Sequence, residues 1–149
     1  MSAMSLDLLV TYLGGEKAMG LKHHIDPLAL HKVIREGIPA RCAFYFREHA
    51  GLTNVVVCEM LGVSEKTFIR WQTAPKKHLD PVFSDRLVRS AKVMALAETV
   101  LESPESARGW INEPQAALGG EVPSRLLTTD VGSQQVENLL LQMEYGYLA

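Results

Sequence analysis

Apolar residues recur at helical spacing along most of the chain, and no stretch sustains the alternation of apolar and polar residues that is typical of a β-strand. Asp26-Pro27 and Asp80-Pro81 each combine an N-cap residue with proline at the first helical position. The connections between the predicted helices are too short for the crossovers of a parallel sheet. The chain is therefore expected to fold as an all-α helical bundle.

The predicted helices cover residues 6–13, 27–36, 39–49 and 81–102. Ser103-Pro104 ends the last of these helices and begins the next, and Thr129 or Asp130 caps a final helix. Within 81–102 the apolar residues fall largely on one stripe, which is expected to face the core: Val82, Leu87, Val88, Ala91, Met94, Ala95 and Val100.

The composition is that of one globular domain, or of two very small domains with a shared core. Of the 149 residues, 47% are hydrophobic and 21% are charged, which excludes an intrinsically disordered chain. No apolar run approaches the roughly 20 residues of a membrane span, and no basic region precedes an apolar stretch near Met1, so a cytoplasmic protein is expected. Cys42 and Cys58 lie among apolar neighbours and are expected to be buried free thiols.

Charge is distributed unevenly along the chain. Residues 53–95 carry seven Lys and Arg against four Asp and Glu, whereas residues 96–149 carry two against eight. This asymmetry indicates a polyanionic partner for the middle of the chain and a different partner for its end; a solvated basic face is the alternative. We divide the chain into an N-terminal helical region (1–50), a central segment (51–95) and a C-terminal module (96–149).

The central segment contains the pattern of a helix-turn-helix. Thr53 and Ser64 are N-cap residues eleven positions apart, and Gly62 between them permits the positive φ of a steep turn. The alternative is a helical corner with a purely structural role. The positions expected to face a common core are in register with the turn: Val57, Cys58, Leu61, Val63, Phe68 and Trp71.

The second helix of this motif carries the candidate DNA contacts, because its N-terminal half enters the major groove in such motifs. Lysine and arginine match phosphates or guanine edges, serine and threonine match phosphates or bases, and glutamate matches the cytosine amino group. Ile69 is expected to point outward on the same face. One motif makes few base contacts, so a homodimer on two half-sites of operator DNA, with strongly salt-sensitive binding, is expected. The predicted DNA-binding residues are Ser64, Glu65, Lys66, Thr67 and Arg70.

The C-terminal module contains two glycines and two prolines between Pro114 and Pro123, which predict a shaped turn rather than a flexible linker. Beyond a helix stop at Gly146 the chain has a tyrosine and a leucine, preceded by Tyr145; these either pack back on their own domain or anchor a partner. The final helix is expected to bury Val136, Leu139, Leu140 and Met143, and to expose the acids Asp130, Glu137 and Glu144.

Three sets of residues match one family. The first is Asp26-Pro27-Leu28-Ala29-Leu30 with Gly37-Ile38-Pro39, and the second is the helix-turn-helix. The third and most specific set is Trp110-Ile111, Pro114, Ala117-Leu118-Gly119-Gly120, Pro123, Leu126-Leu127, Thr129, Gly132, Val136, Leu139-Leu140, Met143-Glu144 and Gly146. Over its whole length the chain thus resembles the Xre/MbcA/ParS family of type II antitoxins, although residues 73–77 are less basic than is common in that family.

The resemblance implies a cytoplasmic bacterial antitoxin that is dimeric, represses its own operon and neutralises a co-encoded toxin. In this family the usual toxin has a RES domain, resembles ADP-ribosyltransferases, and consumes NAD or transfers ADP-ribose from it. Neutralisation there involves the antitoxin's C-terminal region, which covers the active-site cleft of the toxin. The candidate toxin-binding residues are accordingly Glu144, Tyr145, Tyr147, Leu148 and Ala149.

No pattern indicates an enzyme, a metal site or a cofactor. The neighbours His23 and His24 are the closest approach to a ligand pair, and adjacent residues on a helix point apart. Cys42 and His49 are seven residues apart on a predicted helix, about 10 Å, which is too far for a nucleophile and its base. Two alternatives to the antitoxin remain: a stand-alone transcription regulator whose C-terminal module dimerises it or senses a ligand, and an adaptor that does not bind DNA.

Overall fold

The computed structural model describes residues 5–22 and 24–146 of the chain. In these ranges there are ten α-helices, one 3₁₀-helix and no β-strand, so the predicted all-α fold is confirmed. The elements in chain order are α1 (Leu6–Tyr12), α2 (Glu16–Met19), α3 (Pro27–Glu36), α4 (Arg41–Ala50), α5 (Asn54–Leu61), α6 (Glu65–Trp71), α7 (Pro81–Leu101), α8 (Pro104–Ile111), η1 (Ala116–Leu118), α9 (Pro123–Leu126) and α10 (Asp130–Tyr145).

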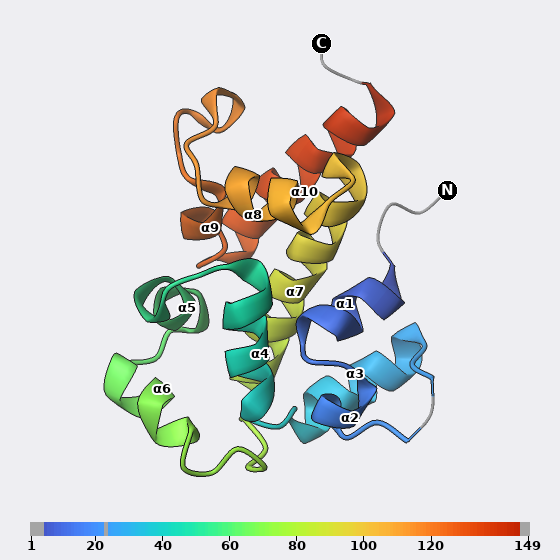
Figure 1. The fold of residues 1–149 in the computed structure, drawn as a ribbon, viewed down its shortest axis with the longest axis vertical. Coiled ribbons are helices and arrows are strands. Elements are labelled where there is room, and N and C mark those ends of the chain that lie inside the picture. The colour runs from blue at the N-terminus through green and yellow to red at the C-terminus, as the bar shows by residue number, and fades with distance from the viewer. Residues whose placement is uncertain (1–4, 23, 147–149) are drawn as a thin grey trace.

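Helix α7 is the axis of the molecule (Figure 1). It is 21 residues long, and α1, α3, α4, α5, α8 and α10 all pack against it. Ala91, Ala95 and Ala97 are fully buried, and these small side chains allow the neighbouring helices to approach closely. Figure 1 shows α6 towards one end of the molecule and α8, α9 and the end of α10 towards the other. The predicted boundary between residues 95 and 96 lies inside α7, so this helix supports both predicted segments.

Side-chain caps begin several helices at the predicted positions. Asp26 Oδ1 accepts a hydrogen bond from the backbone N–H of Ala29 at 2.7 Å, and Ser103 Oγ accepts one from the N–H of Ser106 at 3.0 Å. Asp80 occupies the N-cap position of α7, but its side chain accepts no such bond. The start of α7 therefore depends on proline at the first helical position and on packing.

Three predictions about individual elements are wrong. Helix α4 begins at Arg41 rather than at 39, because the backbone of Pro39 pairs with His78 in an isolated bridge. Val82 is 55% exposed, since it lies nine residues, or two and a half turns, before the buried Ala91 and so on the opposite side of α7. Glu137 and Glu144 of α10 are half-buried rather than exposed, and the carboxylate of Glu137 pairs with a lysine of α7.

Both cysteines are free and buried, as predicted. Burial raises the pKa of the Cys42 thiol to about 12, so this group stays neutral at any physiological pH. Cys58 lies on α5, where its small side chain is 4% exposed. Neither thiol is accessible as a nucleophile, which agrees with their assignment as packing residues.

Candidate nucleic-acid interface

The turn between α5 and α6 is built around Gly62. Its φ of +73° lies in the left-handed region that favours glycine. Arg86 of α7 reaches this turn, where its Nη1 donates a hydrogen bond to the Leu61 carbonyl at 2.8 Å. A Cβ on Gly62 would lie 2.5 Å from the same nitrogen. Glycine therefore suits the backbone conformation of this turn, and a Cβ here would displace the end of the Arg86 side chain from the Leu61 carbonyl.

Two buried aromatic residues fix α6 on the rest of the protein. The ring of Phe68 lies 4.6 Å, between centroids, from that of Phe44 on α4, and Trp71 lies 5.8 Å from Phe83 on α7. Aromatic pairs at these separations contribute about 0.5–1.5 kcal/mol beyond the area they bury. The orientation of α6 is thus set by the core, so its outer face is preformed.

The five predicted DNA-binding residues all lie on α6 or at its N-cap. Glu65, Lys66 and Arg70 are exposed, whereas Thr67 is half-buried. Ser64 contributes to the fold: its Oγ accepts a hydrogen bond from the Thr67 N–H at 3.1 Å and donates one to Thr67 Oγ1 at the same distance. This cap orders the first turn of α6, and Lys66 and Arg70 are the exposed basic side chains of this helix.

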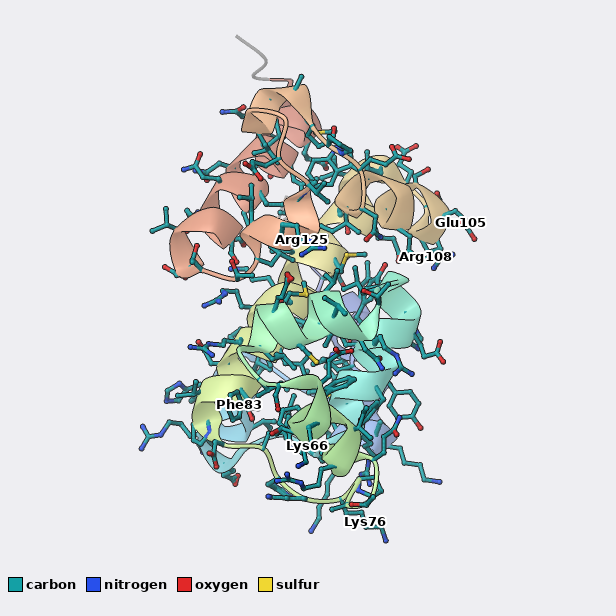
Figure 2. The ribbon with its side chains drawn as sticks, turned by 90° about the vertical axis from the view of Figure 1, so that its left-hand side faces the viewer. Lys66, Lys76, Phe83, Glu105, Arg108 and Arg125 are labelled. Carbon is teal, nitrogen blue, oxygen red and sulfur yellow. The ribbon has the colours of Figure 1, made fainter. Side chains whose placement is uncertain are left out.

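The basic residues of segment 53–95 separate into two groups. Arg86, Arg89 and Lys92 of α7 are engaged inside the chain, with a backbone carbonyl or with carboxylates of α10. In the part of the chain that the structure describes, the other four have no carboxylate partner within ion-pair distance, and all are exposed. Figure 2 shows two of them, Lys66 on α6 and Lys76 in the loop after it, at the same end of the molecule. We call these four residues the basic face: Lys66, Arg70, Lys76 and Lys77.

Sequence reasoning did not include Lys76 and Lys77 among the DNA-binding candidates, because they follow the second helix rather than lie on it. The backbone holds their loop in place: the Lys77 carbonyl accepts the Ala40 N–H at 2.7 Å, and the Pro75 carbonyl accepts the Arg41 N–H at 3.0 Å. The loop is therefore tied to the start of α4. A fixed loop next to α6 enlarges the preformed cationic surface.

The C-terminal module contacts the helix-turn-helix directly. Arg125 of α9 pairs with Glu59 of α5 through both carboxylate oxygens, with Nη1 2.6 Å from Oε1. Both side chains are partly exposed, so this pair orients the two elements more than it stabilises them. Arg125 is labelled in Figure 2, where it lies above the helix-turn-helix. No local sequence pattern predicts this contact, because 66 residues separate the partners.

Gly132 is one of the C-terminal residues that carry the family resemblance, and the structure shows why a glycine stands there. A Cβ on Gly132 would lie 2.9 Å from the carbonyl carbon of Leu126 and closer still to its oxygen. The Thr129 side chain caps α10 by accepting the Gly132 N–H at 2.9 Å. Leu127, between the two helices, is fully buried. The glycine thus allows the end of α9 to pack against the first turn of α10.

Of the five predicted toxin-binding residues, the structure describes two. Glu144 and Tyr145 end α10; Glu144 is half-buried and Tyr145 is 47% exposed. Tyr147, Leu148 and Ala149 lie outside the described residues. The end of α10, which these two residues form, lies towards the opposite end of the molecule from α6 (Figure 1).

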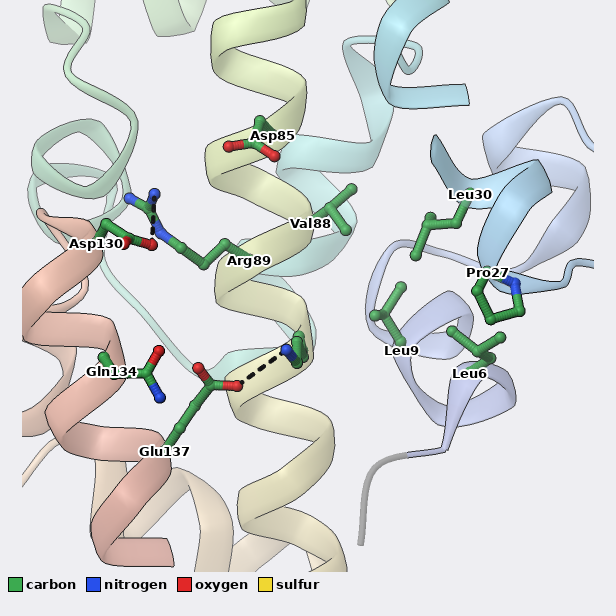
Figure 3. Close-up of a pocket in the computed structure, with 11 residues that line it drawn as sticks. Leu6, Leu9, Pro27, Leu30, Asp85, Val88, Arg89, Asp130, Gln134 and Glu137 are labelled. Atoms are coloured by element: carbon green, nitrogen blue, oxygen red, sulfur yellow. Dashed lines mark ion pairs between the residues drawn. The ribbon is translucent and has the colours of Figure 1, made fainter. Parts of the chain in front are cut away.

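Residues of α1, α3, α7 and α10 line a groove of about 400 Å³. In Figure 3, α7 lies between α10 on one side and α1 and α3 on the other. The ionic side of the groove contains two pairs that join α7 to α10: Arg89 Nη1 lies 3.9 Å from Asp130 Oδ1, and Lys92 Nζ lies 3.2 Å from Glu137 Oε1. The buried Nε of Arg89 has no hydrogen-bond partner. Its apolar side is formed by Leu6, Leu9, Pro27, Leu30 and Val88.

In the described ranges no three His, Cys, Asp or Glu side chains come together as a metal site requires. None of the helices in the described part of the chain combines the length and hydropathy needed to cross a bilayer.

A helix-turn-helix with a preformed basic face is joined through one long helix to an acidic helical module, so the fold is that of a helix-turn-helix protein with a second helical module. Residues 29–92 match the model of the antitoxin Xre-like helix-turn-helix domain, and residues 96–146 match that of the antitoxin Xre/MbcA/ParS C-terminal toxin-binding domain. The chain belongs to the Xre/MbcA/ParS antitoxin family, whose members are not enzymes.

Individual relatives agree with this assignment. Over 64 residues, which are 43% of this chain, the sequence is 44% identical to the antitoxin Xre of Pseudomonas putida strain KT2440; the aligned part spans 40% of that relative's length. Among solved structures, the fold is similar to a chain of the M. tuberculosis MbcT–MbcA toxin–antitoxin complex, with 25% identity and a TM-score of 0.53. That similarity covers 74% of this chain and 96% of the other.

Proposed function

We propose that this chain is the cytoplasmic antitoxin of a co-encoded RES-type toxin and has two activities. Its C-terminal module neutralises the toxin, which consumes NAD or transfers ADP-ribose from it, by covering the active site. Its helix-turn-helix binds operator DNA as a homodimer and represses its own operon. The observation that carries the proposal is the match of residues 96–146 to a toxin-binding domain, in a module at the opposite end of α7 from the basic face.

The DNA-binding activity is supported by the basic face. Four exposed cations lie on or beside a helix whose orientation the core fixes, and among the described residues they have no carboxylate partner. The other basic side chains of the segment form hydrogen bonds or ion pairs within the chain. Phosphate contacts need free cations, and base contacts need side chains on a preformed helix. The exposed Lys66 and Arg70 satisfy both requirements, and two-fold pairing of the chain would supply a second half-site.

Toxin neutralisation is supported by the charge of the C-terminal module, by Tyr145 and by a similar solved structure. Residues 96–149 carry eight acids against two basic residues, and a site that holds an anionic dinucleotide has the complementary charge. Tyr145 presents a partly exposed ring at the end of α10, and such rings are common anchors in interfaces. The similar M. tuberculosis structure is that of a toxin–antitoxin complex, which favours a protein partner for this module.

A stand-alone transcription regulator is the second candidate, and the groove favours it. The groove combines an apolar side with ionic groups and has the volume of a small-molecule site. In this candidate a ligand there would change how α10 packs on α7, and no toxin would bind. The match to a toxin-binding domain makes this the weaker candidate.

Co-purification separates the two candidates. The chain, tagged at its N-terminus and expressed together with its flanking genes, is expected to bring down a neighbouring gene product, which intact-mass analysis identifies. That product is expected to stop growth when it is expressed alone and to deplete NAD or modify a target with ADP-ribose. A homodimer that arrives without a partner, beside neighbours that are not toxic, would refute the antitoxin proposal and leave the regulator.

A further inference from the structure

The outer face of α6 contains one large apolar side chain. Ile69 is 50% exposed and does not pack on the core, whereas its neighbour Phe68 is fully buried. Lys66 and Arg70 stand three residues before it and one after it, so Lys66 shares its helix face and Arg70 borders it. An exposed isoleucine is ordinary by itself, but this one lies within the surface proposed to enter the major groove.

The major groove offers one apolar group to such a side chain. Among the base edges exposed there, only thymine presents a methyl group, and apolar residues recognise thymine by contact with it. Along α6, Ile69 lies about 4.5 Å beyond Lys66, a distance comparable to the 3.4 Å step between base pairs. With α6 lying along the major groove, Ile69 would face a base pair next to the one that Lys66 faces.

We propose that Ile69 determines sequence specificity by contact with the 5-methyl group of a thymine in each half-site. This inference rests on the proposed DNA-binding function and extends it, because the basic face alone would bind any phosphate backbone. The contact would make the protein distinguish thymine from the other three bases, and also from uracil, which has the same hydrogen-bonding groups without the methyl.

The test uses that last difference. Duplexes bound by the wild-type protein are selected from a random pool, and each conserved dT is replaced in turn by dU. Wild-type binding is expected to weaken about fourfold at one position per half-site, as for the loss of one buried methyl group. Ile69→Ala is expected to bind the dT and dU duplexes equally, and Ile69→Val to retain part of the difference.

Val131→Ala is the matched control, because Val131 is also exposed but lies on α10; it is expected to keep the full dT preference. Circular dichroism establishes that each variant folds, and a half-exposed side chain makes loss of the fold unexpected. The inference is overturned if no dU substitution weakens wild-type binding, or if Ile69→Ala keeps the dT preference. Failure of the wild-type protein to select any duplex would refute the DNA-binding function itself, and the inference with it.

Discussion

The replacement Gly132→Ala tests how the C-terminal module is packed. The new Cβ would lie 2.9 Å from the carbonyl carbon of Leu126 and closer to its oxygen. These are backbone atoms, which cannot rotate away as a side-chain end can, so the first turn of α10 must separate from α9. Overpacking of this kind costs about 3 kcal/mol, the upper part of the usual range. For a chain of this length that lowers Tm by about 6–12 °C.

Gly109→Ala is the matched control. Gly109 lies within α8, and a Cβ added there would meet nothing within 4 Å. Alanine is expected to stabilise the protein by about 0.5–1 kcal/mol, through helix propensity and lower entropy of the unfolded chain. Thermal unfolding followed by circular dichroism measures both variants. The packing argument is refuted if Gly132→Ala melts within 2 °C of wild type, or if both alanines shift Tm in the same direction.

Three further predictions concern charge and burial. In DNA-binding titrations at several salt concentrations, Lys66→Ala and Arg70→Ala are each expected to reduce the slope of log K against log salt by about 0.9 per lost phosphate contact; an unchanged slope would remove that residue from the interface. A double-mutant cycle with Glu59→Gln and Arg125→Gln, followed by urea unfolding, is expected to give a coupling energy of about 0.2–1 kcal/mol, because the pair is partly exposed. The absence of any coupling energy at low salt would contradict the contact. Burial raises the pKa of the Cys42 thiol from 9.0 to about 12, so this thiol ionises at lower pH in the unfolded chain than in the folded one. The free energy of unfolding is therefore expected to fall as pH rises from 9 to 12, and to fall less in Cys42→Ala. The same pH dependence of unfolding in both proteins would refute this prediction.

Local signals predicted most of the fold. N-cap residues followed by helical spacing located the helix-turn-helix, with caps at Thr53 and Ser64 and the turn at Gly62. These signals are encoded within a few residues of the feature that they determine, so one sequence suffices to detect them. The four-residue helix α2 escaped prediction because it is too short to show an apolar period.

Tertiary contacts were the part that the sequence did not predict. The pairing of Arg125 with Glu59 and the burial of Glu137 beside Lys92 both depend on helices that meet only in the folded chain. For the same reason, the sequence did not distinguish the cations of the basic face from Arg86, whose side chain donates a hydrogen bond to the Leu61 carbonyl in the turn. The candidate DNA-binding residues stay a prediction, as do the toxin-binding ones.

The central claim is that one chain has two separable activities, and a pair of variants tests it most directly. Growth protection against the co-expressed neighbour and binding to upstream duplex DNA are measured for a chain that ends at Met143 and for the Lys66→Ala/Arg70→Ala double variant. The shortened chain is expected to lose protection and to bind DNA as wild type does, whereas the double variant is expected to do the reverse. Full protection by the shortened chain, or loss of both activities in either folded variant, would contradict the account.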